Sequence, residues 1–152
     1  MGRLAPRKGT TMFEDQEYPI DLAIVKEAFS RDRFATHALG AVVEKVDADE
    51  VVCSVALDPV HFNAHGNVMG GAIFTLADFA LAIACNVHET PTVSISNTIN
   101  FLSGVKGTRL YAHARTNRSG RQVGFYTVTV NDDLGTDIAV MEAVCSRRPR
   151  TE

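Results

Sequence analysis

A single carboxylate stands inside an otherwise uncharged apolar stretch of this chain. Asp78 is the only Asp, Glu, Lys or Arg between His65 and Glu89. Burying an ionised carboxylate without a partner costs several kcal/mol or raises its pKa. A carboxyl group in such a setting is typical of one that takes a proton from water or attacks a carbonyl carbon. Asp78 is therefore the first candidate for chemistry in this sequence.

A glycine-punctuated segment lies directly before this stretch. Residues 61–71 read His-Phe-Asn-Ala-His-Gly-Asn-Val-Met-Gly-Gly, and Asp78 follows the Gly70-Gly71 pair by about two helical turns. Backbone N–H groups at the start of a helix can donate hydrogen bonds to a developing oxyanion. A carboxylate that serves the same carbonyl can act as base or nucleophile. The pattern favours acyl-transfer chemistry.

Hydrophobic periodicity indicates the elements that must position these groups. Residues 71–88 predict a long helix that is apolar on nearly every face, so other structure must enclose it. Residues 19–33 have the spacing of a second helix. Strands are predicted at residues 40–46, 51–57, 92–101, 109–116, 122–131 and 136–147. The turns between the last strands are too short for parallel crossovers. The order predicts an α+β fold in which an antiparallel sheet curls around the helix.

Size and charge limit the possible functions. A chain of 152 residues is one domain, which we place at residues 19–152, after a polar, mobile arm at residues 1–18. The net charge of −3 gives no electrostatic case for nucleic acid or an anionic membrane. The N-terminus lacks the apolar region of a secretory signal, and the apolar run at residues 72–85 is too short to span a bilayer. We expect a cytoplasmic protein.

Cysteine and histidine spacing argues against metal and thiol chemistry. Cys53, Cys85 and Cys145 are far apart in apolar contexts, as expected of buried free thiols in a reducing compartment. Cys85 as a nucleophile is disfavoured because an apolar helix should raise its pKa. His61 and His65 suggest a metal pair, but catalytic zinc requires three protein ligands and no acid nearby completes a set. We predict no metal site. A serine nucleophile elbow is also absent.

A resemblance to a known family adds to this interpretation. The segment from Asn63 to Asn86 resembles the PaaI-type branch of the hotdog-fold acyl-CoA thioesterases. The matching residues are Asn63, Gly66, Gly70-Gly71, Phe74, Leu76-Ala77-Asp78, Ala80 and Cys85-Asn86, then Ile99 to Leu102, Gly107, Leu110 and Gly120-Arg121. The resemblance covers roughly residues 38–147. It implies a six-stranded sheet around a central helix. It also implies homodimers paired edge to edge, often paired again into tetramers, with an active site shared by two subunits.

The resemblance also implies roles for individual residues. Asp78 matches the catalytic carboxylate, which acts as general base or as nucleophile through a mixed anhydride. Gly70 matches the glycine whose N–H donates to the thioester oxygen, with the helix dipole in support. Asn63 matches the amide that places the thioester or the water. The chemistry needs no metal and no further cofactor, since coenzyme A is part of the substrate.

Substrate contacts are expected from the same region. Gly71 and His61 lie in the loop, and Met69 stands where many relatives have His. Arg121 lies in a predicted turn and is a candidate contact for the phosphates or adenine of coenzyme A. Candidate walls of the acyl pocket are Phe62, Phe74, Phe79 and Phe101.

We therefore predict a thioesterase that hydrolyses a small or medium acyl-CoA, aromatic acyl groups included. Two alternatives stay open. The His61-Phe62 and Met69-Gly70 pairs faintly resemble the active-site loop of hotdog dehydratases, although that loop's prolines are absent here. A non-catalytic module that binds acyl-CoA is the other alternative, and intact Asp78 and Gly70 speak against it.

Overall fold

The computed structural model describes residues 17–87 and 91–147. The elements in chain order are α1 (Leu22–Phe29), η1 (Phe34–Leu39), β1 (Val42–Val46), β2 (Val51–Ala56), η2 (Pro59–His61), α2 (Gly70–Asn86), β3 (Thr92–Phe101), β4 (Arg109–Ser119), β5 (Val123–Asp132) and β6 (Asp137–Arg147). The predicted arm lies outside the described residues, apart from Glu17 and Tyr18, and stays a prediction. Among the described helices, none is both long and apolar enough to cross a membrane.

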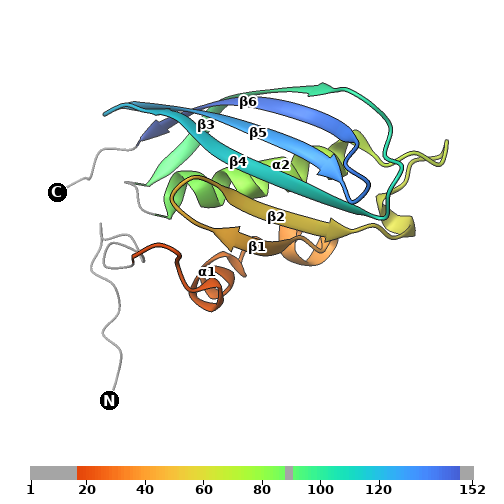
Figure 1. Ribbon diagram of the computed structural model, residues 1–152, viewed down its shortest axis with the longest axis horizontal. Helices are drawn as coiled ribbons and strands as arrows, with labels where there is room; N and C mark the ends of the chain where they lie inside the picture. Colours follow the sequence, from red (N-terminus) through yellow and green to blue (C-terminus); the bar gives the residue numbers. More distant parts are fainter. Residues whose placement is uncertain (1–16, 88–90, 148–152) are drawn as a thin grey trace, which may run out of the picture.

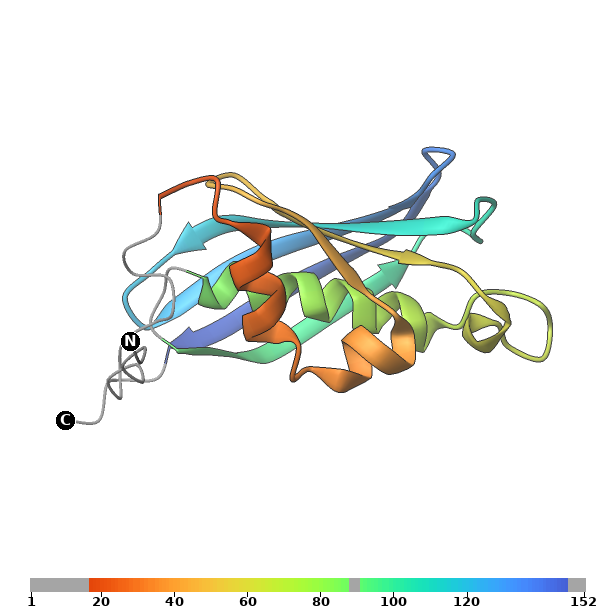
Figure 2. The ribbon, with the colours of Figure 1, turned by 90° about the horizontal axis from the view of Figure 1, so that it is seen from below.

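The strands form one antiparallel sheet that curves around α2. Their order is β1-β2-β4-β5-β6-β3, and every neighbouring pair is antiparallel. Figures 1 and 2 show α2 lying along the hollow side of the sheet. The helix contacts β2, β3, β4, β5 and β6 as well as η1. The predicted α+β architecture, a six-stranded antiparallel sheet around one long helix, is confirmed.

The core lies between α2 and the inward-facing rows of the strands. Fully buried side chains include Leu76, Leu81 and Ile83 from the helix and Leu110, Tyr126, Val128 and Met141 from the sheet. In β5 the sequence alternates two rows that both contain Val, and the structure buries the row of Tyr126, Val128 and Val130. Because almost every face of α2 is apolar, only one narrow face of it can remain outside this core.

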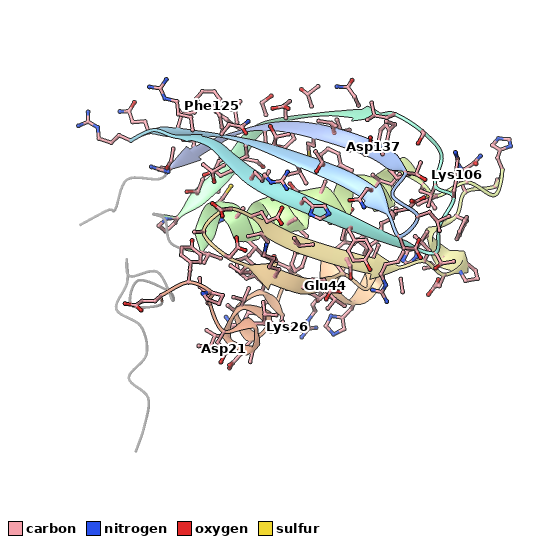
Figure 3. All side chains as sticks on the ribbon, viewed as in Figure 1. Asp21, Lys26, Glu44, Lys106, Phe125 and Asp137 are labelled. Carbon is pink, nitrogen blue, oxygen red and sulfur yellow. The ribbon has the colours of Figure 1, made fainter. Side chains whose placement is uncertain are left out.

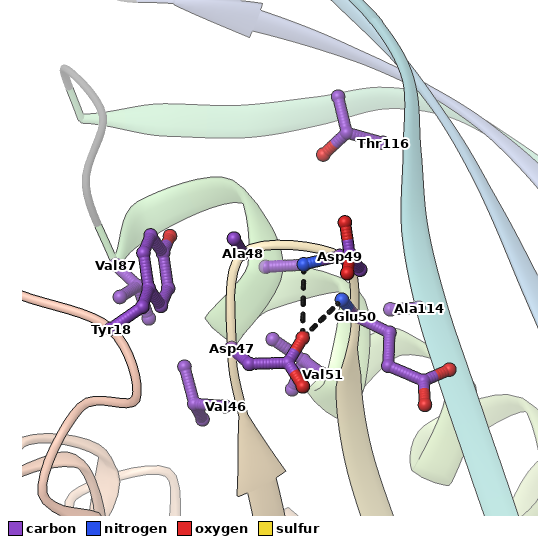
Figure 4. A pocket seen from close by; sticks show the side chains of 11 residues that line it. Tyr18, Val46, Asp47, Ala48, Asp49, Glu50, Val51, Val87, Ala114 and Thr116 are labelled. Atoms are coloured by element: carbon purple, nitrogen blue, oxygen red, sulfur yellow. Dashed lines mark hydrogen bonds between the residues drawn. The ribbon is translucent and has the colours of Figure 1, made fainter.

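The hairpin between β1 and β2 turns at residues 47–50, as the sequence predicts. The side chain of Asp47 accepts hydrogen bonds from the N–H groups of Asp49 and Glu50, each at 2.9 Å. Figure 4 shows this carboxylate inside the turn. An aspartate that bonds to the backbone two and three residues ahead closes a tight turn without glycine.

The helix predicted at residues 19–33 is present in the structure, but an unpredicted helical turn follows it. α1 is shorter, and a separate wide helical turn, η1, follows at Phe34–Leu39. The Ala35 carbonyl accepts the N–H groups of both Gly40 and Ala41, and Gly40 has a φ of 81°. A left-handed glycine of this kind ends a helix sharply, which directs the chain into β1. η1 contacts α2 and, with α1, lies on its open side in Figure 2.

Candidate active site

One face of α2 is left partly open by the sheet. Its residues recur every three or four positions and are not fully buried: Gly71, Thr75, Asp78, Ala82 and Asn86. This spacing places them in one line along the helix. The central member of the line is Asp78, the one charged side chain of α2.

The Asp78 carboxylate is partly buried and has one amide partner. Asn97 of β3 donates from Nδ2 to Asp78 Oδ1 at 3.1 Å. Burial raises the pKa of Asp78, the Asn97 hydrogen bond lowers it, and the charge of Asp32 raises it further; the net direction is upward. An acid with a raised pKa is a better proton acceptor when it is ionised, as a general base must be.

Pockets reach Asp78 from two sides. The acid pocket, of about 310 Å³, is lined by Asp32, Arg33, Phe34, Ala35, Thr75, Asp78, Phe79 and Ala82. A second pocket of about 230 Å³ lies between α2 and the strands β3 and β6, with Asp78, Ser94 and Cys145 in its wall. The Asp78 side chain can therefore meet a substrate or a water molecule without any change in the core.

An apolar pocket lies beside the start of α2. It has a volume of about 360 Å³, and its lining is Phe34, Ala38, Leu39, Val60, His61, Met69, Gly71, Ala72 and Thr75. Phe34 and Thr75 also line the acid pocket. Phe34 is 72% exposed, so a large ring stands at the boundary between the apolar pocket and the pocket that contains Asp78.

The loop before α2 is a small closed unit. Phe62 pairs with Val68 as an isolated bridge, and the Met69 N–H donates to the His61 carbonyl at 2.8 Å. Gly66 has a φ of 78°, which other residues adopt only with strain. Asn63 lies within this unit, and its Oδ1 accepts the N–H groups of His65 and Asn67. Since Oδ1 is occupied, Nδ2 is the end of Asn63 that can donate to a ligand.

The start of α2 presents backbone donors. Met69 is the N-cap, and no side chain of the described residues caps this end of the helix. The first N–H groups of a helix have no partner within it, so those of Gly70 and Gly71 can donate outward. The space beside Gly70 is also limited. A Cβ there would lie 3.1 Å from Cζ of Phe101 on β3.

Gly70 and Asp78 cannot serve the same thioester within one chain. At about 1.5 Å of rise per residue, the two lie about 12 Å apart along the axis of α2. A thioester carbonyl must have its oxyanion donor and its attacking group within about 3 Å. One thioester carbonyl therefore cannot contact both groups of a single chain.

His61 is held by backbone groups at both ring nitrogens. Nδ1 accepts the Asp58 N–H at 3.0 Å, and Nε2 lies 2.8 Å from the Leu39 carbonyl oxygen. With Nδ1 as acceptor, the ring proton is on Nε2 and donates to Leu39. The buried ring thus joins η2 to the end of η1, while one of its edges lines the apolar pocket.

The other predicted contacts are spread over the molecule. Met69 and Gly71 line the apolar pocket, and Phe74 is partly buried against the core. Arg121 is exposed in the turn between β4 and β5. That turn, near the labelled Phe125 in Figure 3, is at the end of the sheet opposite the labelled Lys106, where α2 begins. Within one chain, Arg121 does not approach the start of α2.

Three residues of the site were not found by sequence reasoning. Asn97 lies in a strand rich in polar residues, where no simple alternation shows which of them face the helix. Phe34 belongs to η1, which the periodicity did not predict. Thr75 carries a signal that could have been used, because it is one helical turn before Asp78. No three His, Cys, Asp or Glu side chains of the described residues gather closely enough to hold a metal ion.

Comparison with known proteins identifies a family with this fold. The thioesterase superfamily model matches residues 65–139. Acyl-coenzyme A thioesterase PaaI of Escherichia coli K12 is 31% identical over 111 residues, covering 72% of this chain and 79% of that protein. Acyl-coenzyme A thioesterase 13 of Homo sapiens is 26% identical over 112 residues, covering 71% of this chain and 80% of that protein.

A solved structure supports the same family and fold. The E. coli PaaI protein from the phenylacetic acid degradation operon superposes with a TM-score of 0.77 and 26% identity, covering 86% of this chain and 95% of that one. The residues matched by the thioesterase superfamily model include the end of the loop, all of α2 and most of the sheet. The resemblance inferred from sequence is confirmed: this chain belongs to the thioesterase superfamily, in the PaaI-type branch with the hotdog fold.

Proposed function

We propose that this protein hydrolyses an acyl-CoA thioester to a free acid and coenzyme A, with Asp78 as the acid that drives the reaction. One observation carries the proposal. Asp78 is the carboxylate on the open face of α2, it is reached by two pockets, and its pKa is raised. A relative in the same family is named acyl-coenzyme A thioesterase PaaI. Membership of the family supports the reaction type.

Asp78, Gly70 and a water molecule suffice for the chemistry. As a base, the Asp78 carboxylate takes a proton from water, and the water oxygen attacks the thioester carbon. As a nucleophile, it forms a mixed anhydride that water then hydrolyses. In both routes the carbonyl oxygen becomes negative and takes the N–H of Gly70, and the coenzyme A thiolate leaves. After a single turnover in ¹⁸O-water, ¹⁸O in Asp78 would establish the anhydride route, because water would then have attacked the aspartyl carbonyl of the anhydride.

We infer that the working enzyme is a homodimer, which can pair again into a tetramer. The separation of Gly70 and Asp78 along α2 requires a second chain. β3 lies at the edge of the sheet, and it and the residue after it expose the large apolar side chains of Val93, Ile95, Phe101 and Leu102. An exposed, apolar strand edge is a template for pairing with another strand. Pairing of two β3 strands would bring Gly70 of one protomer toward Asp78 of the partner subunit.

The apolar pocket is the proposed site of the acyl group. It lies beside Gly71 and contains several apolar side chains and few polar atoms. Its volume of about 360 Å³ is at the lower end of the range typical of small-ligand pockets. This size suits a short or medium aliphatic chain or a single aromatic ring. Met69, His61 and Gly71 would line the acyl group, and Phe74 would support it from the core.

Coenzyme A would extend away from this pocket. Asn63 Nδ2 is proposed to donate to the thioester or to the attacking water. Arg121 is proposed to meet the coenzyme A phosphates. Since Arg121 is remote from the start of α2 in its own chain, this contact also depends on the second subunit.

No observation favours the dehydratase alternative. That reaction would require His61 to move a proton on the substrate, and backbone groups occupy both of its ring nitrogens. A module that binds acyl-CoA without hydrolysis differs from the proposed enzyme only in turnover. An activity measurement therefore decides between them.

The test is thiol release from a panel of aliphatic and aromatic acyl-CoAs by wild type and Asp78→Asn. Asp49→Asn is a matched control, because Asp49 is an exposed acid in the β1–β2 turn. We expect turnover by wild type and by the control, and a loss of at least about a hundredfold in Asp78→Asn with an unchanged circular dichroism spectrum. Equal turnover by Asp78→Asn would overturn the role of the acid. Binding without turnover by wild type would establish the binding module.

A further inference from the structure

We propose that Asn97 is a positioning residue of this site, which holds one oxygen of the Asp78 carboxylate so that the other is presented to the reactants. Nothing in the sequence pattern singles out Asn97, and the inference rests on the proposed role of Asp78. The main evidence is the hydrogen bond that Asn97 Nδ2 donates to Asp78 Oδ1 at 3.1 Å. It leaves Oδ2 as the oxygen that can meet a water molecule or a thioester carbon.

A bulge in β3 directs Asn97 toward the helix. Ser94 pairs with Cys145, but Ser96 pairs with Val144, so one extra residue, Ile95, is inserted between them. In a regular strand, Ser94 and Asn97 would face opposite sides of the sheet, because they are three positions apart. The bulge lets both face α2. Bulges of this kind often occur beside active sites, where they re-aim a side chain.

The neighbours of Asn97 across the sheet and further along β3 are apolar. Its neighbour across the sheet is Ala143, which is buried. The next inward-facing residues of β3 are Ile99 and Phe101. Among the described residues, Asp78 is the polar group that the Asn97 side chain contacts.

The second polar atom of Asn97 supports the same conclusion. Its Oδ1 is buried and has no hydrogen-bond partner in the part of the chain that the structure describes. A structural asparagine normally satisfies both ends of its amide, because an unpaired buried acceptor is unfavourable. Rotating the amide would satisfy Oδ1 no better, since it would place that oxygen against the Asp78 carboxylate. The amide is thus oriented by the acid alone.

The surroundings of Asp78 make its pKa depend on the contact with Asn97. Asp32 and Arg33 line the acid pocket from the segment before η1. The thiols of Cys85 and Cys145 line the pocket on the other side. Burial and Asp32 both raise the pKa of Asp78, and the Asn97 hydrogen bond opposes them. Removing the amide should therefore keep Asp78 protonated, and inactive as a base, up to a higher pH.

The first test is the pH dependence of kcat/KM for Asn97→Leu. We expect kcat at pH 7 to fall by about ten- to a hundredfold, the range for losing a hydrogen bond to a charged group. KM should stay within about twofold, and the acid limb of the profile should move to higher pH. Asn100→Leu is the control. It is the same substitution on the same strand, but Asn100 pairs with Val140 on the outer row, so its profile should match wild type.

Asn97→Asp gives a sharper readout. At low pH the new carboxyl group is protonated and can still donate to Asp78. At higher pH the two carboxylates repel each other, so activity should decline where wild-type activity is constant. An inert structural position would show neither effect. Wild-type profiles for both Asn97 variants would overturn the proposal.

A titration that needs no turnover separates this proposal from the proposed function. The carboxyl ¹³C resonance of Asp78 can be followed against pH in wild type and in Asn97→Leu, with thermal melts to show that both are folded. We expect the midpoint to move to higher pH in the variant, whether or not any acyl-CoA is hydrolysed. An unchanged midpoint would refute the role of Asn97. Absent turnover with a shifted midpoint would refute the proposed function alone.

Discussion

The Phe101 ring lies directly over Gly70, so that a Cβ on this glycine would come within 3.1 Å of the ring's Cζ. Phe101 is the last residue of β3 and Gly70 is the first residue of α2. The edge strand of the sheet and the proposed oxyanion donor are therefore in contact. A shift of this edge strand would therefore move the residue that contacts Gly70.

This contact gives a test of the Gly70 N–H. Gly70→Ala adds a Cβ and keeps the N–H, whereas Gly70→Pro adds the same Cβ as part of a larger ring and removes the N–H. Proline is well tolerated at the first position of a helix, and Met69 is already extended, with a ψ of 136°, as a residue before proline must be. We expect Gly70→Ala to retain most activity and Gly70→Pro to lose about a hundred- to a thousandfold in kcat. Equal losses would show that bulk against Phe101, and not the donor, is decisive.

Mixing two inactive variants tests whether the site is shared. Gly70→Pro and Asp78→Asn damage opposite halves of the proposed site. When the two chains are co-expressed and assemble at random, half of the dimers contain one of each, and each such dimer has one intact site. We expect about a quarter of wild-type activity in the mixture, against almost none in either variant alone. A site built within one chain would recover no activity, and separately tagged chains allow the mixed dimer to be isolated.

The raised pKa of Asp78 has a consequence for stability. The folded state penalises the ionised form, mainly through burial. This penalty is present above the folded-state pKa and vanishes below the unfolded-state value, so it lowers stability as pH rises. We expect Asp78→Asn to melt at a higher temperature than wild type at pH 7, and this difference to disappear as pH falls below about 4. A variant that melts lower at pH 7 would contradict the direction of the shift.

His61 should matter more for stability than for turnover. Replacing it with Ala removes the hydrogen bonds that the partly buried Asp58 N–H and the buried Leu39 carbonyl make with its ring. We expect a loss of about 1–3 kcal/mol in the free energy of unfolding, measured by urea titration. The folded fraction should keep turnover within about tenfold of wild type. A thousandfold loss of turnover in a stably folded variant would instead indicate that His61 acts directly in the reaction, as in the dehydratase alternative.

Phe34 should influence the choice of acyl group. Its ring stands between the apolar pocket and the acid pocket, so Phe34→Ala enlarges the space beside a bound acyl chain. We expect the ratio of kcat/KM for long over short acyl-CoAs to change by about tenfold or more. Phe125→Ala is the control, because Phe125 is also an exposed ring but lies at the far end of the sheet. Identical ratios in both variants would place the acyl group elsewhere.

Strong periodicity made most of the fold predictable. The apolar run that became α2 and the alternating stretches that became the strands have patterns that few other structures satisfy. The turn η1 was missed, because a left-handed glycine at position 40 and a wide helical turn leave no periodic signal. The side of β5 that faces the core was equally invisible, since both of its rows contain Val.

The site was predictable to the extent that it is local in sequence. Asp78 stands out because it is charged within an apolar helix, and Gly70 because the chain must begin a helix there. Asn97 was not predictable, because its role depends on a one-residue bulge that only the pairing of β3 with β6 reveals. The predicted substrate contact of His61 stays a prediction, and its hydrogen bonds to distant backbone groups could be seen only in three dimensions.

The edge strand β3 also bears on how the protein behaves before it assembles. Over residues 92–101 it contains no charged residue and no proline, the two features by which monomeric proteins usually protect an exposed strand. A newly made chain therefore has two competing fates, correct pairing with a second copy and indiscriminate aggregation. Refolding yield should depend on this competition, and a charge placed at Ile95 would favour soluble monomers at the expense of assembly.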